Sequence, residues 1–158
     1  MIEATARVLE NIIEMRVGNE SWTCRPVVSA TGSVTRRVAA LFATTYETYR
    51  STEPEAVHST VSYQVKKDEI LIQMEEQKWR THSSLFGPMT IEYGGVTYSI
   101  HEKLTGKFAI LNGVEPIATG ELGFRSCIVR DSPPELEGLF ANLALGYLIR
   151  TLVWEMLR

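Results

Sequence analysis

The feature that constrains this fold most is a C-terminal segment that is apolar on every side. Residues 138–149 contain no charged side chain, and the apolar pattern continues to Val153. Ser132-Pro133-Pro134-Glu135 precedes it, which predicts an N-cap at Ser132, a proline at the first helical position and a Glu three residues after the cap. We therefore expect a helix that runs to near Arg158. Because it lacks a polar face, it must be enclosed by protein or by lipid.

The length of the uncharged run favours protein over lipid. A bilayer span needs about 18–20 apolar residues, and here Glu135 and Glu137 lie before the run while Arg150 and Glu155 follow it. A shorter run of this kind is typical of a buried core helix. The sequence therefore predicts a core helix and no transmembrane segment.

Two polar residues interrupt this helix and need partners in an apolar core. Asn142 has apolar neighbours on both sides, so its amide should be hydrogen-bonded. Arg150 lies about one turn beyond Gly146. We expect Arg150 either to reach solvent at a rim or to pair with a carboxylate, because an unpaired buried charge is costly.

The middle of the chain predicts antiparallel strands. Apolar and polar residues alternate over residues 57–66, 70–74 and 89–100, as expected for strands with one buried face. Gly94-Gly95 and Asn112-Gly113 each separate two such runs, and both dipeptides are hairpin signals because tight hairpin turns need positive φ. Pro116 cannot donate to a ladder, which places it at an edge or a bulge.

The first 50 residues leave alternatives open. Residues 4–17 fit either a helix or a strand followed by an irregular piece, and residues 36–49 fit a strand or a helix. The length of 158 residues is that of one domain with a substantial core. We predict a single mostly β (α+β) domain over residues 1–158, with an antiparallel β-barrel or strongly curved sheet wrapped around the hydrophobic C-terminal helix.

Residues 89–158 resemble the tubby C-terminal-like fold, which tubby proteins, phospholipid scramblases and LURP-one-related proteins share. The likeness is architectural and is carried by the two hairpins, Tyr98-Ser99-Ile100, Pro116-Ile117-Ala118, Cys127-Ile128-Val129 and the apolar helix over residues 136–153. It implies an antiparallel barrel of about twelve strands around the helix. Tubby proteins bind phosphoinositides through a basic surface site, and scramblase-type members are associated with membrane lipids and bind calcium. Neither site maps onto this chain residue by residue.

The sequence contains no pattern that predicts catalysis, a metal site or a cofactor. His58, His82 and His101 fall on predicted strands or strand ends at positions that face solvent. Cys24 and Cys127 lack metal-ligand spacing, and we expect two small buried thiols. The prediction is therefore a domain without catalytic residues, and more a binding module than an enzyme. A hydrolase using Ser, His and a carboxylate lacks the residues in any recognisable arrangement.

Basic residues provide the candidate binding site. If they share one barrel face, six side chains could hold an anionic headgroup: Arg36, Arg37, Lys66, Lys67, Lys78 and Arg80. Nucleic acid is not an expected partner, because the net charge is −3 and the pI is near 5.7. The chain has no secretory signal at its N-terminus, which predicts the cytoplasm, including the periphery of a membrane.

The preferred function is a non-enzymatic binding or scaffold domain for anionic lipid headgroups or for a protein partner. The alternative is a helix-grip carrier of a hydrophobic small molecule, as in START-like domains. In such a carrier the long C-terminal helix covers one face of a curved sheet, so its outer face should be polar. The apolar outer face of this helix argues against the carrier.

Overall fold

The computed structural model describes residues 1–27, 43–83 and 87–157. Most of these residues form strands, followed by one long helix. The strands are β1 (Ile2–Arg7), β2 (Ile12–Val17), β3 (Glu20–Pro26), β4 (Thr45–Arg50), β5 (Glu53–Gln64), β6 (Glu69–Met74), β7 (Gln77–His82), β8 (Met89–Tyr93), β9 (Val96–Glu102), β10 (Lys107–Asn112), β11 (Glu115–Gly123) and β12 (Ser126–Arg130). Two short 3-10 turns, η1 (Val8–Glu10) and η2 (Pro134–Leu136), and the helix α2 (Glu137–Leu157) complete the fold.

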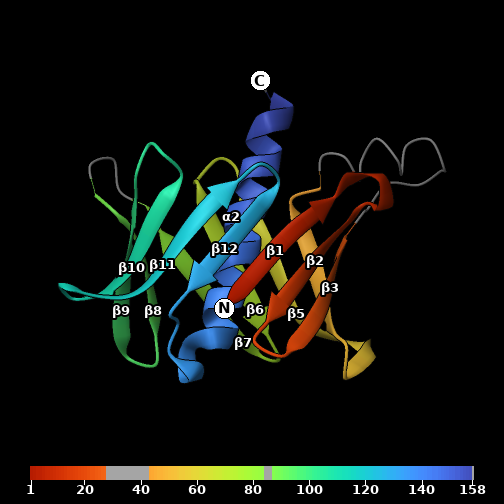
Figure 1. Cartoon of the computed structure of the whole chain (residues 1–158), viewed down its shortest axis with the longest axis horizontal. Coiled ribbons are helices and arrows are strands. Elements are labelled where there is room, and N and C mark those ends of the chain that lie inside the picture. The colour runs from red at the N-terminus through yellow and green to blue at the C-terminus, as the bar shows by residue number, and fades with distance from the viewer. Residues whose placement is uncertain (28–42, 84–86, 158) are drawn as a thin grey trace.

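The twelve strands form a closed barrel (Figure 1). Each strand pairs antiparallel with the next one along the chain, and β1 closes the ring by pairing with β12, Ile2 opposite Val129. Closure gives every described strand a neighbour on both sides, although β7 and β8 pair only at Thr81–Ile91 and His82–Thr90. The predicted mostly β class, with an antiparallel barrel around a C-terminal helix, is confirmed. Residues 4–17, for which the sequence allowed a helix or a strand, belong to β1 and β2 and to the turn η1 between them.

The predicted hairpins join neighbouring strands where the glycines lie. Gly94 and Gly95 connect β8 to β9 with φ angles of 59° and 78°, and Gly113 in the β10–β11 turn has a φ of 64°. Residues with a Cβ adopt such angles only rarely, so the glycines fix the turn positions. Pro116 lies at a register shift between β10 and β11, opposite Leu111. The prediction of an edge or a bulge for this proline is confirmed as a bulge.

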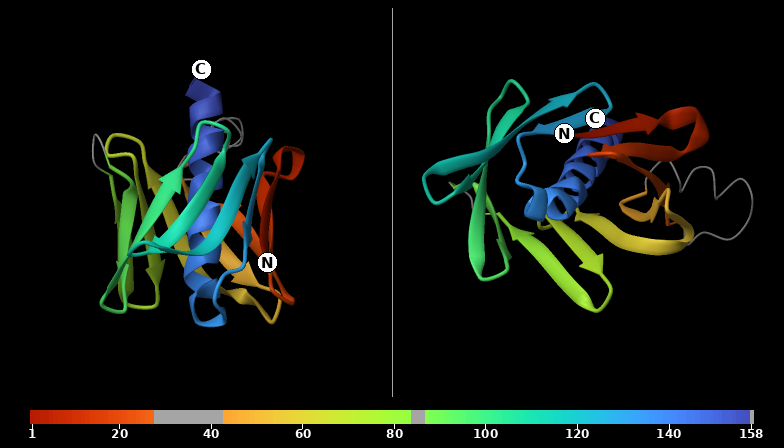
Figure 2. Two further views of the ribbon diagram at one scale, coloured as in Figure 1. Left: turned by 60° about the vertical axis from the view of Figure 1, so that its left-hand side comes forward. Right: turned by 60° about the horizontal axis from the view of Figure 1, so that its bottom comes forward.

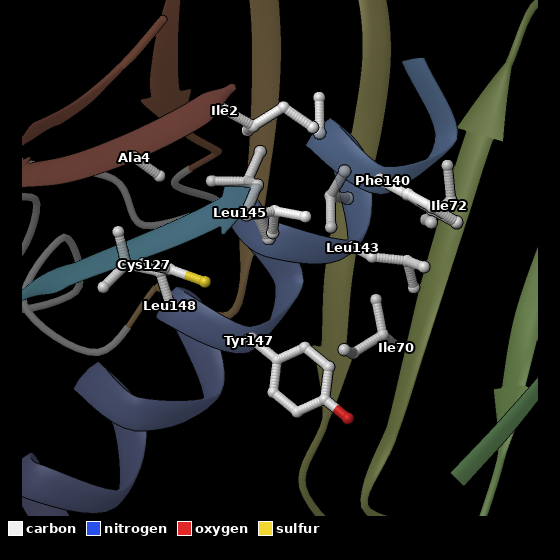
Figure 3. Close-up of a cluster of buried hydrophobic side chains, with 14 of the residues drawn as sticks. Ile2, Ala4, Ile70, Ile72, Cys127, Phe140, Leu143, Leu145, Tyr147 and Leu148 are labelled. Carbon is white, nitrogen blue, oxygen red and sulfur yellow. The ribbon is translucent and has the colours of Figure 1, made fainter. Parts of the chain in front are cut away.

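Helix α2 lies inside the barrel and is surrounded by strands (Figure 2). Every side chain from residue 139 to residue 149 is buried. Its close neighbours come from opposite sides of the ring, as Figure 3 shows: Ile2 and Cys127 lie beside Leu145 and Leu148, while Ile72 lies beside Phe140. The enclosure predicted from the missing polar face is therefore confirmed, and the helix is itself the core of the barrel.

The predicted N-cap at Ser132 is wrong. The turn η2 precedes the helix, and α2 begins only at Glu137. A proline disfavours the helical conformation of the residue before it. Pro133, which precedes Pro134, is accordingly extended, with ψ at 141°. The Ser132 hydroxyl is buried without a hydrogen-bond partner, so it caps no helix. The proline pair thus delays the helix by one 3-10 turn.

Candidate functional site

The last turns of α2 leave the barrel at one end, which we call the exit end (Figure 1). Four short turns lie around the emerging helix: β1–β2 (residues 8–11), β5–β6 (65–68), β9–β10 (103–106) and β11–β12 (124–125). The β1 and β11–β12 segments are joined there by a hydrogen bond of 2.9 Å from the Ala6 N–H to the Arg125 carbonyl. The other end, where the helix begins, carries the β10–β11 turn, and we call it the entry end.

Arg150 ties the emerging helix to two sides of the barrel mouth. Its Nε donates to Asp68 Oδ1 at 2.9 Å, and its Nη1 donates to Glu102 Oε2 at 3.1 Å. Burial alone would lower the pKa of Arg150, but the two carboxylates outweigh burial and raise it. The sequence expectation of a rim arginine paired with a carboxylate is confirmed, with two carboxylates in place of one.

Tyr63 and Trp154 extend this cluster. The Tyr63 hydroxyl donates to Asp68 Oδ1 at 2.6 Å and accepts from the Trp154 indole N–H at 2.8 Å. Asp68 thus receives hydrogen bonds from a strand side chain and from the helix, at a turn position with a φ of 51°. The polar groups at the barrel mouth satisfy one another, which indicates a structural clamp and not a catalytic pair.

A second polar cluster lies deep in the barrel around Asn142. Ser59 donates to Asn142 Oδ1 at 2.7 Å, and Asn142 Nδ2 donates to the Gly138 carbonyl at 2.9 Å. Thr48 is hydrogen-bonded to Ser59 in turn. The expected partners of Asn142 are therefore present. Because these bonds form at only one rotation of the helix, they fix its orientation relative to β4 and β5.

Exposed apolar side chains gather at the exit end. Of the eleven large apolar residues that are exposed in the described part of the chain, eight lie there: Val8, Leu9, Val27, Leu104, Phe124, Trp154, Met156 and Leu157. Leu9 and Leu104 are as exposed as in an extended peptide, at 101% and 109%, and Phe124 is 79% exposed. A group of exposed apolar side chains at one end of a molecule is a candidate interaction site. We call Leu9, Leu104 and Phe124 the apolar tips.

Four basic side chains lie on the turns of the exit end. Lys103 precedes Leu104, Arg125 follows Phe124, and Lys66 and Lys67 lie on the β5–β6 turn across the mouth. The guanidinium carbon of Arg125 lies 4.7 Å from the centre of the Phe124 ring, a cation–π contact. Glu10 and Glu155 add two carboxylates at the same end, whereas Asp68 and Glu102 are paired with Arg150. Over the four described turns and the end of α2, the unpaired charge is therefore positive on balance.

Of the six basic residues predicted to share one barrel face, the structure describes four, and these lie in two places. Lys66 and Lys67 are exposed in the β5–β6 turn at the exit end. Lys78 is exposed on β7 toward the entry end, and Arg80, further along β7, lies 3.8 Å from a Glu69 oxygen. Arg36 and Arg37 lie outside the described residues.

The apolar tips are the functional candidates that sequence reasoning missed. Their signal is an apolar residue inside a polar turn between two alternating strands, as in Lys103-Leu104-Thr105-Gly106. Such a residue has no strand partner to pack against, so it stays exposed. The sequence does not show that several such turns lie at one barrel end. This depends on whether an even or an odd number of strands separates the turns.

The cysteines and histidines form no reactive centre among residues that the structure places. Cys24 and Cys127 are buried free thiols, as predicted, and burial raises the pKa of both. His82 and His101 are exposed, and His58 is partly buried with its ring 4.9 Å from the Trp22 ring. Within the described ranges, no three His, Cys, Asp or Glu side chains lie close enough together to hold a metal ion.

We expect the free energy of unfolding to fall as the pH rises from about 9 to about 12. Burial raises the pKa of Cys127 from 9.0 to about 12, and burial raises that of Tyr46 from 10.0 to about 12. Burial and a hydrogen bond to Asp68 raise the pKa of Tyr63 from 10.0 to about 12. The unfolded chain loses these protons first, so stability present below pH 9 is lost in this window. Each pKa unit corresponds to about 1.4 kcal/mol, so Cys127 contributes on the order of 4 kcal/mol and Tyr46 on the order of 3 kcal/mol. Tyr63 contributes less, because its hydroxyl lies at the barrel mouth, where solvent screens the charge.

Urea unfolding between pH 7 and pH 12 measures this loss. The buried Cys24 and Tyr147, whose pKa values burial also raises, add to the same loss. Cys127→Ala removes one of the two buried thiols, so it should flatten part of the slope that begins near pH 9. A profile that stays level up to pH 11 in the parent protein would contradict the assignment of these groups to the barrel interior.

Within the described chain, η2 and α2 together (Pro134–Leu157) are long and apolar enough to cross a bilayer, although 72% of the most apolar window is buried in the barrel. Comparison with family models, with curated proteins and with solved structures finds no match for this chain. The site is therefore interpreted from its own geometry and charge.

Proposed function

We propose that this protein is a non-enzymatic binding domain that docks on anionic phospholipid membranes through the exit end of its barrel. The observation that carries the proposal is that the three apolar tips and the end of α2 lie at the same barrel end, with Lys103 and Arg125 next to two of the tips. Peripheral binding of this kind needs two signals, inserted apolar side chains and attraction between cations and anionic lipid.

The positions of the tips suit shallow insertion. Leu9, Leu104 and Phe124 lie on three separate turns around α2, and Trp154 and Leu157 lie on its emerging turns. Tryptophan is enriched at membrane–water interfaces because its ring is apolar while its N–H needs a polar partner. Insertion at this end would leave the barrel wall in water and α2 pointing toward the bilayer.

The cations contribute the second signal. Lys103 is exposed beside Leu104, and Lys66 and Lys67 are exposed on the β5–β6 turn at the same barrel end. Each Lys or Arg close to an anionic leaflet contributes about 1 kcal/mol, and salt screens this term. A protein partner could also cover an apolar surface. The flanking lysines favour an anionic membrane, and a protein partner becomes an outcome of the test below.

The helix-grip carrier has less support. It requires a helix lying on one face of an open sheet, whereas α2 is enclosed by a closed barrel. Membership of the tubby C-terminal-like family also remains a proposal. It is supported by the arrangement of twelve antiparallel strands around a buried C-terminal helix, which is the architecture that the resemblance implies.

The triple variant Leu9→Ser, Leu104→Ser, Phe124→Ser tests the proposal. Burying a leucine or phenylalanine side chain contributes about 1.5–3 kcal/mol, so even partial insertion of three should change partitioning by roughly 100-fold. Co-sedimentation with vesicles of phosphatidylcholine and phosphatidylserine, with and without phosphoinositide, measures it. We expect the parent protein to bind, more weakly at high salt, and the triple variant to lose most of its binding.

Val114→Ser is the matched control, because Val114 is 95% exposed at the entry end. It should bind vesicles like the parent. The variant Lys66→Gln, Lys67→Gln should bind more weakly and with less salt dependence. Failure of the parent protein to sediment with any anionic vesicle, or an equal loss in Val114→Ser, would remove the proposal and leave a protein partner as the better explanation of the tips.

A further inference from the structure

A groove with a volume of about 90 Å³ opens at the exit end, between the β1–β2 turn and the last turns of α2. The buried side chains of Ile13 and Tyr46 lie at its base. Val8, Leu152 and Met156 line its sides. The groove therefore has an apolar base, although Arg7, Asn11, Arg125 and Glu155 also line it. It begins beside the surface that we propose to meet the membrane.

Arg125 lies at this groove with unused hydrogen-bonding capacity. Its Nε is buried and has no hydrogen-bond partner, and no carboxylate that the structure places lies within 4.0 Å of its guanidinium group. Leaving a buried donor unpaired costs about 1–3 kcal/mol, and more for a charged group. A bound acceptor with a negative charge would recover this cost.

The position of Arg125 is fixed by its surroundings. Its carbonyl accepts the N–H of Ala6, and its guanidinium group stacks on the Phe124 ring. The other arginine at the groove, Arg7, is paired with Glu14 at 2.8 Å. Glu155 also lines the groove, so an anion is favoured beside Arg125 and not elsewhere along it.

We propose that this groove binds one fatty-acid molecule from the bilayer, with the carboxylate on Arg125 and the methylene groups next to it in the apolar groove. This inference rests on the proposed membrane docking, which would bring the groove to the lipid surface. The rest of the acyl chain extends past Val8 and Met156 toward the hydrocarbon of the bilayer.

The groove is large enough for one acyl chain and too small for two. An engineered cavity of about 150 Å³ holds one benzene ring, and the groove is smaller at about 90 Å³. Two acyl chains side by side do not fit this volume. A single-chain carboxylate does not need to leave the bilayer completely, because only its head and the first methylenes enter the protein.

Decanoate titration followed by methyl NMR tests the inference without any vesicles. We expect saturable shifts of the methyl signals of Val8, Leu152 and Met156. A charge-assisted hydrogen bond contributes about 1.5–3 kcal/mol, so decanoate should bind at least about tenfold more tightly than neutral 1-decanol. Arg125→Gln should reduce decanoate affinity to that of 1-decanol, and Arg125→Lys should restore part of it because it keeps the charge.

Arg130→Gln is the matched control, since Arg130 is exposed at the other end of β12 and should leave decanoate binding unchanged. Equal affinity for decanoate and 1-decanol, or unchanged decanoate affinity in Arg125→Gln, would overturn the proposal. Vesicles of phosphatidylcholine with equal mole fractions of oleate or phosphatidylglycerol distinguish fatty-acid binding in the groove from membrane docking of the exit end. Loss of the oleate preference alone in Arg125→Gln supports the groove, whereas no binding of the parent protein to either vesicle contradicts docking while the decanoate result stands.

Discussion

Leu143→Asp is expected to prevent folding. Leu143 is 1% exposed in the middle of α2 and lies close to Ile70, which belongs to β6 (Figure 3). An aspartate there would place an unpaired carboxylate among apolar side chains, where the charge must be neutralised or the structure must open. The cost exceeds about 4–5 kcal/mol, which is a large part of the stability of a typical domain. The expected result is insoluble protein, or soluble protein without a cooperative thermal transition.

Leu157→Asp on the same helix is the control. Leu157 is 57% exposed at the exit end, so the same substitution should change the thermal midpoint little. Leu143→Met, which conserves volume and polarity, should also fold. A soluble Leu143→Asp variant that unfolds cooperatively near the parent midpoint would mean that α2 is not enclosed by the barrel.

Most of the fold could be predicted because its strongest signals are local. The alternation over residues 57–66 and 89–100 and the glycines of the β8–β9 turn set strands and hairpins, and the uncharged run over residues 138–149 requires enclosure. Closure of the ring could not be predicted in this way. It depends on the pairing of β1 with β12, which joins residues more than 100 positions apart and leaves no local pattern.

The predicted start of the helix was wrong for a local reason. Ser132 has the chemistry of an N-cap, but Pro133 is held extended by the proline that follows it, so the first helical turn cannot form there. A residue's capping chemistry predicts a helix start only where the next two backbone positions can adopt helical angles.

The candidate site was predicted least well. Basic residues can be counted in a sequence, but whether they meet depends on which turns lie at the same barrel end. Lys67 and Leu104 are 37 positions apart and lie at the same end because an even number of strands separates their turns. The apolar tips stand out only once such turns are known to surround the emerging helix.

Gly146→Leu is expected to destabilise the protein by more than about 3 kcal/mol, because added volume in a packed core forces neighbours out of position. A Cβ at Gly146 would lie 2.4 Å from Cγ2 of Ile70 and 2.9 Å from its Cδ1. Ile70 is fully buried, and close-packed cores yield little to added volume. Urea unfolding of the purified variant, or its failure to accumulate as soluble protein, measures the effect.

The double variant Gly146→Leu, Ile70→Ala separates this overlap from other causes. Ile70→Ala alone should cost about 2–5 kcal/mol, because it leaves a cavity between β6 and α2. In the double variant the new leucine fills the space that the isoleucine occupied, and the total side-chain volume changes little. We therefore expect it to be more stable than either single variant, a favourable coupling of at least 1–3 kcal/mol in a double-mutant cycle. Additive losses would mean that residues 70 and 146 do not pack against each other. In that case α2 would lie at a different position along the barrel axis.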